Sequence, residues 1–475
     1  MLMFTRNKLS QKGLSKMFIG RNEEISKINR MLSRQEQSVC LIYGRRRIGK
    51  TELIKHVLKE SAVSGIYYEC KETSEENNAA SINDLIAEHF GIPVPAFSSV
   101  EETLTFLFQQ AEKEPLIFVL DEYPYLQKTG KGMDSILQSL IDKFKPTSKM
   151  KLILCGSFVD TMKSLLEKQN PLYGRVDLTL ELLAMDYYDS AKFYPDFSDE
   201  DKVRLYSVFG GIPYYNRLIE SNKTVRENII ELIASPGARL ENEVSMNLKS
   251  ELAKVTNANE VFDALARGYS KYNDILSQSH VSSSPALADV LGKLCRMQVV
   301  EKTAPINDAN NRKKASYRIC DNLSLFYYKY IFRYSSQIRI MNTDFFYDRY
   351  IADDFENKYV PKAFEEISKQ YLIRMNRNGM MEVPFDQIGR YYYDDPEART
   401  NGEFDVVTHD EKGYIFYEVK FRTKPLERTR IEAEIDQVKR VHLDCYRYGF
   451  ISRSGFEKGV DQDDLILIDI KDLYE

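Results

Sequence analysis

The fold is decided by one stretch of the sequence, Val39-Cys40-Leu41-Ile42-Tyr43-Gly44-Arg45-Arg46-Arg47-Ile48-Gly49-Lys50-Thr51. Its last eight residues match the pattern G-x-x-x-x-G-K-[ST], in which glycines let the backbone turn its N–H groups towards phosphate. A lysine at position 50 reaches the β- and γ-phosphates, and a hydroxyl at position 51 holds Mg²⁺. A strand before the motif and a helix after it, predicted over 52–59, complete this cradle. The sequence therefore predicts a site for ATP and Mg²⁺ made of Gly44, Arg45, Arg46, Arg47, Ile48, Gly49, Lys50 and Thr51.

The three arginines of this motif are not equivalent to its glycines and lysine. They occupy variable positions whose side chains need not point inwards, so some of them can be solvated instead of contacting phosphate.

A second segment, Leu116 to Glu122, is an apolar strand that ends in two carboxylates. The C-terminal ends of parallel strands form the edge of a sheet at which ligands bind. We expect Asp121 to hold Mg²⁺, through water, and Glu122 to polarise the attacking water. Together with the phosphate cradle, this segment predicts a site for nucleotide hydrolysis.

Two further residues are weaker candidates for the same site. Ser157 follows a predicted strand over 151–155 and either contacts the γ-phosphate and orients the water or is an ordinary turn serine. Arg175 either neutralises charge on the transferred phosphoryl group, in its own chain or a neighbour's, or forms a surface ion pair.

The composition excludes several other classes of protein. A net charge of -5 means that nucleic-acid binding would need a local basic patch. The six cysteines are scattered without a Cys-x-x-Cys pair, which argues against a zinc site or a disulfide framework. No apolar run is long enough to cross a membrane, and residues 1–16 lack the apolar core of a secretion signal, so we expect a cytoplasmic protein without a membrane partner.

The order of the predicted elements indicates four domains. Apolar strands alternate with helical segments up to about residue 185, which is typical of an α/β fold with a parallel sheet. The strands are predicted over 39–43, 65–70, 116–120, 151–155 and 176–182, the first four covered on both faces and the last at an edge. The domains are predicted over 1–185 (nucleotide-binding core), 186–240 (helical), 241–340 (helix, turn, helix and a two-stranded wing, with its polar tip over 307–314) and 341–475.

The last domain carries two carboxylates and a lysine on a predicted hairpin. Strands over 403–408 and 414–420 flank a four-residue turn, and if His409 pairs with Tyr414, then Asp405 lies opposite Glu418. Opposed carboxylates repel unless a cation lies between them, and Mg²⁺ prefers such oxygen ligands. Alternation places Lys420 on the same face. The other interpretation is a solvated ribbon with coincidental charges.

Several of these segments together resemble a known family. The segments Phe18-Ile19-Gly20-Arg21-Asn22-Glu23-Glu24, 43–51, Gly156-Ser157, Pro171-Leu172-Tyr173-Gly174-Arg175 and Gly211-Ile212-Pro213 are similar to archaeal-type ATPases of the signal-transduction (STAND) branch of the AAA+ class. The resemblance implies a P-loop AAA+ core, a helical lid near the nucleotide and a winged helix. It also implies slow switching by ATP and the possibility of a nucleotide-dependent homo-oligomer.

The C-terminal arrangement is similar to the PD-(D/E)XK nuclease core, which often follows the ATPase in this family. The resemblance implies that Asp405, Glu418 and Lys420 are active residues, that Glu365 is a further metal ligand and that Gln437 is an accessory residue. Glu366 adjoins Glu365, so which of the two points inwards is open. Two functions follow: an ATPase coupled to a metal-dependent nuclease acting on DNA or RNA, or a slow ATP switch whose C-terminal domain does not cut. A basic run from Lys420 to Arg430 either is a solvated face or contacts a phosphate backbone, and the winged helix either contacts DNA or is a structural lid.

Overall fold

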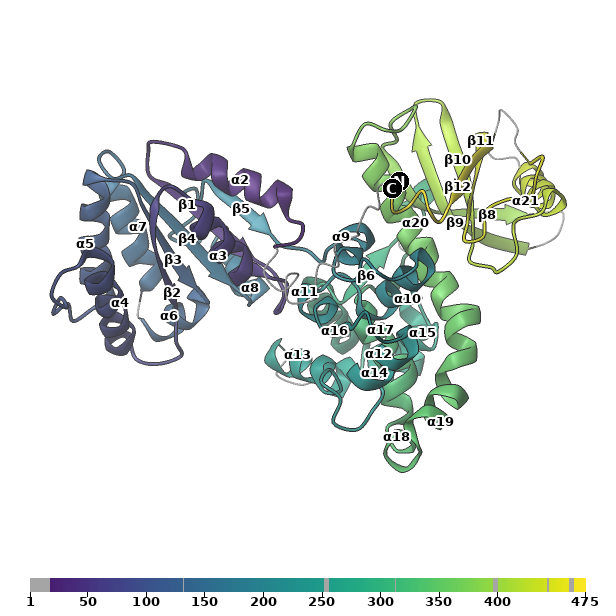
Figure 1. Cartoon of the computed structure of the whole chain (residues 1–475), viewed down its shortest axis with the longest axis horizontal. Helices are drawn as coiled ribbons and strands as arrows, with labels where there is room; N and C mark the ends of the chain where they lie inside the picture. Colours follow the sequence, from purple (N-terminus) through teal and green to yellow (C-terminus); the bar gives the residue numbers. More distant parts are fainter. Residues whose placement is uncertain are drawn as a thin grey trace, which may run out of the picture. The chain divides into compact units, whose positions relative to one another are not determined.

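The structure is a computed structural model that describes residues 18–130, 132–251, 256–311, 313–395, 400–441, 444–460 and 465–475. Residues 1–16, on which the predicted location partly rests, lie outside the described residues. The chain divides into two compact units, Met1–Leu183 and Ala184–Glu475 (Figure 1). None of the helices that the structure describes is long and apolar enough to span a lipid bilayer.

The first unit is built on a parallel sheet with the strand order β2-β3-β4-β1-β5. Each predicted strand forms, and its ends lie within two residues of the prediction. The order has one consequence for the site, because β4 lies between the strand that leads into the phosphate motif and the strand that ends in two carboxylates. The strands are β1 (Ser38–Tyr43), β2 (Ser64–Glu69), β3 (Leu116–Asp121), β4 (Met150–Gly156) and β5 (Leu178–Glu181).

Burial follows the position of each strand in the sheet. β1, β3 and β4 are buried along their whole length, and β5 lies at an edge as predicted. The prediction that β2 is covered on both faces was wrong. It is the other edge strand of the described sheet, and Ser64, Gly65 and Glu69 are exposed.

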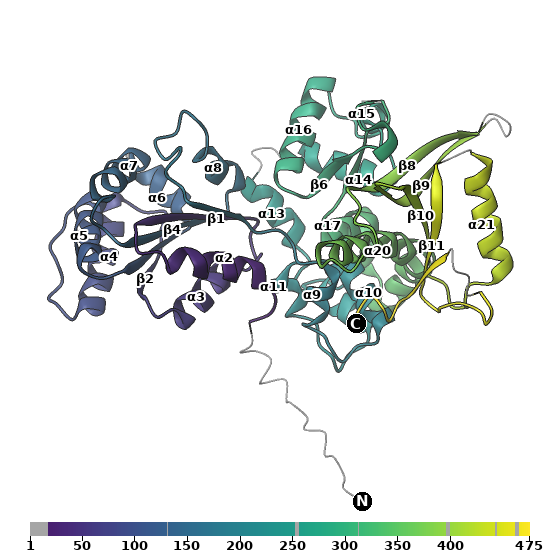
Figure 2. The ribbon, with the colours of Figure 1, turned by 90° about the horizontal axis from the view of Figure 1, so that it is seen from above.

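Helices cover this sheet, with α3 and α7 on opposite sides of it (Figure 2). The Ser74 and Ser99 side chains cap α4 and α5 by accepting backbone N–H groups of the first turns. Helix α2 begins at Asn22, and its cap position is Arg21, whose side chain makes no capping hydrogen bond. The helices are α2 (Asn22–Leu32), α3 (Lys50–Glu60), α4 (Glu75–Phe90), α5 (Val100–Lys113), α6 (Tyr123–Thr129), α7 (Met133–Phe144) and α8 (Val159–Ser164).

The second unit begins with helices and continues into the elements expected of a winged helix. Three helices, α14, α15 and α16, precede the antiparallel pair β6 and β7. This is the predicted order of elements, while the identity of the winged helix and the domain boundaries stay predictions. The elements are α9 (Tyr187–Ala191), α10 (Asp199–Phe209), α11 (Pro213–Asn216), α12 (Val225–Leu232), α13 (Glu243–Glu251), α14 (Thr256–Ala266), α15 (Tyr272–Gln278), α16 (Ser284–Arg296), β6 (Val300–Thr303) and β7 (Ser316–Ile319).

A mixed five-stranded sheet with the order β12-β11-β10-β9-β8 follows in the same unit. It is preceded by α17 (Asn322–Phe326), which continues into π- and 3₁₀-helical turns over 327–334, by α18 (Gln337–Ile340) and α19 (Thr343–Tyr347), and by the long helix α20 (Val360–Arg377). Helix α21 (Arg428–Arg440) connects β10 to β11. The strands are β8 (Gln387–Asp395), β9 (Thr400–Asp410), β10 (Gly413–Lys420), β11 (Cys445–Ser452) and β12 (Leu465–Asp469).

The described residues between β6 and β7, 304–311 and 313–315, are called the wing segment below, and their helical turn at Ile306–Asp308 lies against β8. The Asn307 side chain donates to the Tyr392 carbonyl at 2.7 Å and accepts the Tyr392 N–H at 3.0 Å. The Lys314 ammonium lies 3.6 Å from the centre of the Tyr392 ring. Arg390, two residues earlier, bonds Thr303 at 2.9 Å and Glu403 at 2.6 Å. The wing segment is therefore attached to the C-terminal sheet.

Candidate functional site

The phosphate motif forms a tight turn between β1 and α3. Gly49 has a φ of 92°, in the left-handed region that favours glycine. A Cβ atom on Gly44 would lie 2.4 Å from the Leu182 carbonyl oxygen, so only glycine fits there. The Lys50 Nζ donates to the carbonyl oxygens of Gly44 at 2.8 Å and Arg45 at 3.1 Å. Burial lowers the pKa of Lys50, which is 5% exposed. The backbone of the turn thus holds the Lys50 ammonium beside the Gly44 and Arg45 carbonyl groups.

Asp121 lies beside this turn and receives three donors. Thr51 and Tyr67 each donate a hydroxyl to its Oδ2 at 2.6 Å, and the Glu122 N–H bonds its Oδ1 at 2.9 Å. Burial alone would raise the pKa of Asp121, but hydrogen bonds from Cys155, Thr51 and Tyr67 lower it. The residue therefore stays ionised, and its carboxylate lies next to the hydroxyl that the motif assigns to Mg²⁺.

Ser157 joins the two halves of the site. It follows β4, and its hydroxyl accepts from the Lys50 Nζ at 2.8 Å while donating to the Glu122 carboxylate at 2.5 Å. Its backbone N–H bonds the other Glu122 oxygen at 3.1 Å. Glu122 has a φ of 51°, an unusual conformation for a side chain other than glycine, and such conformations gather at functional sites. The three residues form a continuous polar chain from the cradle to the second carboxylate.

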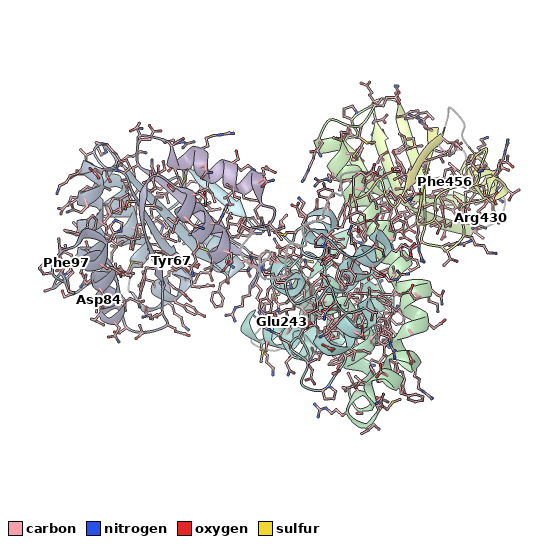
Figure 3. The ribbon with its side chains drawn as sticks, in the orientation of Figure 1. Tyr67, Asp84, Phe97, Glu243, Arg430 and Phe456 are labelled. Atoms are coloured by element: carbon pink, nitrogen blue, oxygen red, sulfur yellow. The ribbon has the colours of Figure 1, made fainter. Side chains whose placement is uncertain are left out.

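Tyr67, labelled in Figure 3, was missed by the sequence analysis. It lies on β2, two positions before Glu69, which pairs with Asp121 on β3. Burial and its bond to Asp121 raise the pKa of Tyr67, so the phenol stays protonated and donates. No signal in the sequence alone could have found Tyr67, because its contact with Asp121 depends on the pairing of β2 with β3.

We expect Tyr67→Phe to weaken the response to Mg²⁺. The Mg²⁺ concentration for half-maximal ATP turnover should rise about tenfold, because residues that orient a metal ligand typically contribute that much to metal affinity. Turnover measured as a function of Mg²⁺ at saturating ATP tests this. Tyr68→Phe is the matched control, since the Tyr68 hydroxyl bonds Asn78 instead. An unchanged Mg²⁺ dependence would leave Tyr67 as a purely structural residue.

The Arg21 side chain contacts the phosphate turn through hydrogen bonds to backbone carbonyl groups. One of its guanidinium nitrogens donates to the Leu183 carbonyl at 2.6 Å and to the Ile48 carbonyl at 3.3 Å. Another bonds Glu24 at 3.1 Å. The segment that carries the family resemblance at the start of the fold therefore supports the motif by direct contact.

The predicted arginines of the first unit have different surroundings. Arg175 forms a two-pronged pair with Asp142, at 2.9 and 2.7 Å, as its alternative interpretation expected. Arg46 lies over the Phe158 ring at 5.6 Å, next to Ser157. Arg47 has a φ of 66°. Contacts of Arg45, Arg46, Arg47 and Arg175 with a nucleotide stay predictions.

The predicted hairpin register of the C-terminal domain is confirmed. His409 pairs with Tyr414, and the last pair of the ladder is Val406 with Tyr417. Asp405 and Glu418 are the next residues on the two strands, directly beyond this last pair. The Lys362 Nζ lies 3.0 Å from Asp405 and 2.6 Å from Glu365, so both carboxylates face one ammonium. Burial and the charge of Asp405 raise the pKa of Glu365 to about 7.

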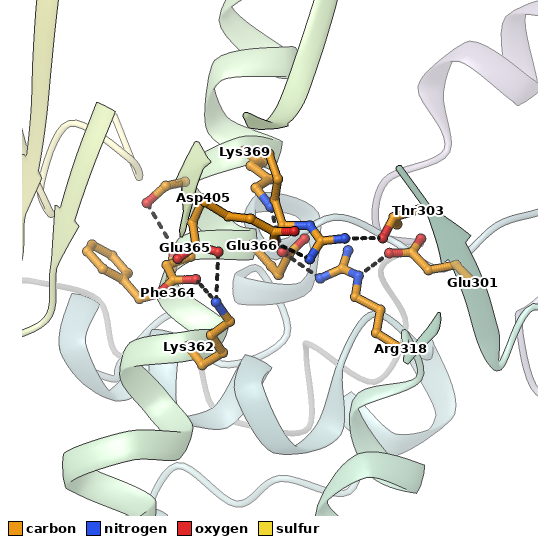
Figure 4. A network of polar contacts seen from close by, with 12 residues as sticks. Glu301, Thr303, Arg318, Lys362, Phe364, Glu365, Glu366, Lys369 and Asp405 are labelled. Carbon is orange, nitrogen blue, oxygen red and sulfur yellow. Dashed lines mark hydrogen bonds and ion pairs between the residues drawn. The ribbon is translucent and has the colours of Figure 1, made fainter. Parts of the chain in front are cut away.

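The structure answers which of the two adjacent glutamates faces the hairpin. Figure 4 shows Glu365 directed to Lys362 and Asp405, and Glu366 directed to Arg318. The Glu366 carboxylate lies 2.5 Å from Arg318 and 2.8 Å from Lys369. Burial would raise the pKa of Glu366, but Lys369 and Arg318 lower it to about 2.

Glu418 and Lys420 form a second cluster. They pair with each other, and Lys420 lies 3.6 Å from Glu434, which also pairs with Arg430 at 2.7 Å. Burial raises the pKa of Glu418. Glu434 was missed by the sequence analysis. Gln437, the predicted accessory residue, donates to the Tyr393 hydroxyl at 3.2 Å.

The two C-terminal clusters do not form one metal site in the described part of the chain. There, no group of three His, Cys, Asp or Glu side chains is arranged to hold a metal ion. The donors themselves fit Mg²⁺, because the Asp405 and Glu365 oxygens already face one cation. In the basic run, Arg428 pairs with Glu432, whereas Arg422 and Lys424 are exposed.

Comparison with known proteins supports the fold of the first unit. It is an α/β fold with a parallel sheet that is typical of a P-loop ATPase core. Residues 18–218 match a family described as an ATPase domain predominantly from Archaea, and residues 327–434 match a family of archaeal and bacterial proteins of unknown function. The chain is thus similar to an archaeal-type ATPase domain in its first part and to the second family in its C-terminal part.

Individual relatives extend this result. An uncharacterised protein of Methanocaldococcus jannaschii is 28% identical over 437 residues, which cover 91% of each chain. An uncharacterised ATP-binding protein of the same organism is 38% identical over 47 residues, 10% of this chain and 80% of its own length. The solved structure of a Walker-type ATPase of Pyrococcus abyssi has a TM-score of 0.51 at 19% identity, covering 68% of this chain and 98% of its own, which shows the fold alone.

Proposed function

We propose that the chain hydrolyses ATP and that its nucleotide state controls a C-terminal, metal-dependent nuclease-like domain that acts on DNA or RNA. The observation that carries the ATPase half is the chain from Lys50 through Ser157 to Glu122. Such a chain connects the residue that contacts the γ-phosphate to the residue that accepts a proton from water.

The residues of the first site have separate roles in this proposal. Lys50 and the backbone N–H groups of the motif bind the phosphates, and Thr51 and Asp121 hold Mg²⁺, which supplies charge neutralisation at the phosphates. Glu122 takes the proton of the attacking water, and Ser157 orients its carboxylate. Arg175 is proposed as the residue that neutralises charge on the transferred phosphoryl group after release from Asp142.

The nuclease half is supported by the shared surroundings of Glu365 and Asp405. Two carboxylates from different elements, α20 and β9, face one position that Lys362 fills. We propose that a divalent cation displaces Lys362 and binds Glu365 and Asp405, and that Glu418 leaves Lys420 to join them as a third ligand. Lys420 then positions water, and the exposed Arg422 and Lys424 contact a phosphate backbone.

We expect Asp405→Ala to abolish metal-dependent cleavage. Even residues that only orient a metal ligand typically contribute 10- to 100-fold, so the loss of a ligand should lower cleavage by at least about 100-fold. The measurement is cleavage of single-stranded, duplex and branched DNA and of RNA with Mg²⁺ or Mn²⁺, with and without ATP. ATP turnover should stay unchanged. Glu411→Ala, an exposed carboxylate in the same hairpin, is the matched control.

A second candidate function is favoured by the position of Lys362. An ammonium between two carboxylates satisfies them without a metal, as expected of a scaffold that no longer cuts. In that case the chain is a slow ATP switch that changes partner binding. Wild-type protein that cleaves none of the four substrates with either metal would favour the switch over the nuclease.

A further inference from the structure

A cavity of about 470 Å³ lies inside the second unit, and it shares one lining residue, Lys362, with the C-terminal candidate site. Its walls come from α10, the end of α14 and the connection that follows it, β6, β7, α17, the helical turns that carry Lys329 and Lys358, and α20. Cavities of about 300 to 1,000 Å³ are the size that small molecules occupy in proteins. All lining residues belong to one compact unit, so the cavity does not depend on how the two units are placed.

Cationic side chains outnumber carboxylates in the wall of the cavity. Four cations line it against two carboxylates, and three further carboxylates outside the lining, Asp354, Glu365 and Asp405, pair with Lys329, Lys358 and Lys362. The cations are Arg318, Lys329, Lys358 and Lys362, and the carboxylates are Glu301 and Glu366.

Lys358 is the most weakly held of the four cations. Its ammonium lies 3.9 Å from Asp354, whereas Lys329 approaches the same carboxylate at 2.7 Å. The Lys358 side chain is 75% exposed. Lys362 follows four residues later and lines the same cavity. A cation with a distant partner can bind an incoming anion without losing a strong ion pair.

The remaining wall is largely apolar. Leu265, Ala266, Ile319 and Leu325 line it, together with the ring of Tyr317. A wall with an apolar side and a cationic side fits a ligand that has a carbon skeleton and an anionic group. Several cations around one space favour phosphate over carboxylate, because phosphate offers more charge and more acceptor oxygens.

We propose that this cavity binds a small phosphorylated organic molecule of about mononucleotide size, with its phosphate at Lys358 and Lys362. The site is separate from the phosphate motif and uses no residue of it. Binding there draws Lys362 towards the ligand and away from Glu365 and Asp405, which frees both carboxylates. This last step rests on the proposed nuclease function, whereas ligand binding does not.

The test uses full-length protein saturated with ADP and Mg²⁺, so that the phosphate motif is occupied. AMP and ribose 5-phosphate are the probes, and adenosine is the uncharged comparison. Both phosphorylated probes should raise the melting temperature, and adenosine should not. Lys358→Gln should weaken this binding about tenfold, as expected for one lost charge-assisted hydrogen bond. Lys439→Gln, which does not line the cavity, is the matched control.

A second variant tests the space instead of the charge. Ala363→Phe places a ring in the cavity and should abolish the shift, with its unliganded melting temperature reporting whether it folds. No shift with either phosphorylated probe, or equal shifts in wild type and Lys358→Gln, would overturn the proposal. Because binding is read from melting, a protein that binds AMP but cleaves nothing would refute the nuclease function and leave the cavity site standing.

Discussion

Lys50→Ala should abolish ATP binding. The Lys50 ammonium donates hydrogen bonds to two carbonyl oxygens of the phosphate turn and to the Ser157 hydroxyl, so it is held where the phosphates would bind. Each charge-assisted hydrogen bond to phosphate contributes about 1.5 to 3 kcal/mol, so losing two weakens binding by about 100-fold or more. The measurement is titration calorimetry with ATP and Mg²⁺, supported by melting temperatures.

The melting experiment gives the same answer independently. A ligand at 100 times its Kd stabilises the folded state by about 2.7 kcal/mol, and Lys50→Ala should lose this stabilisation. Lys59→Ala is the matched control, because Lys59 is exposed in the last turn of the same helix. Affinity retained in Lys50→Ala would mean that the turn is not a phosphate cradle, and the ATPase assignment of the site would be wrong.

Glu122→Gln should bind ATP normally and hydrolyse it slowly. The amide has the shape of the carboxylate and can still accept the Ser157 hydroxyl, but it cannot take a proton from water. Loss of a general base typically lowers turnover by about 10² to 10⁴. Single-turnover hydrolysis, measured beside ATP affinity, separates the two effects.

Glu114→Gln is the control for this variant, since Glu114 is exposed just before the other end of β3. Normal turnover in Glu122→Gln would move the general base to another residue. A fall in affinity as large as the fall in turnover would instead mean that Glu122 acts by holding the site together through Ser157.

Local patterns predicted much of the first unit. The phosphate motif and the apolar strands are contiguous in sequence, so their placement needs no knowledge of distant contacts. The hairpin register was also predictable, because a four-residue turn fixes which residues pair. Ser157 could be named from its place after a strand, yet its contact with both Lys50 and Glu122 depends on β4 lying between β1 and β3.

Contacts that depend on strand order or on helix rotation were not predictable. Tyr67 meets Asp121 only because β2 lies beside β3. The choice between Glu365 and Glu366 depends on the rotation of α20, which adjacent residues of one charge do not fix. Lys362 reaches Asp405 from a different element, and strands β8, β11 and β12 were missed because they carry irregular or short apolar patterns.

The attachment of the wing segment to Tyr392 has a consequence for self-association. β8 is an edge strand of its sheet, and the unpaired main-chain groups of an edge strand can pair with strands of other molecules. The Asn307 amide engages both the N–H and the carbonyl of Tyr392, as a neighbouring strand would. A single side chain thus occupies two main-chain groups in this edge strand that a strand of another molecule would need, and we expect this contact to disfavour intermolecular sheet growth there.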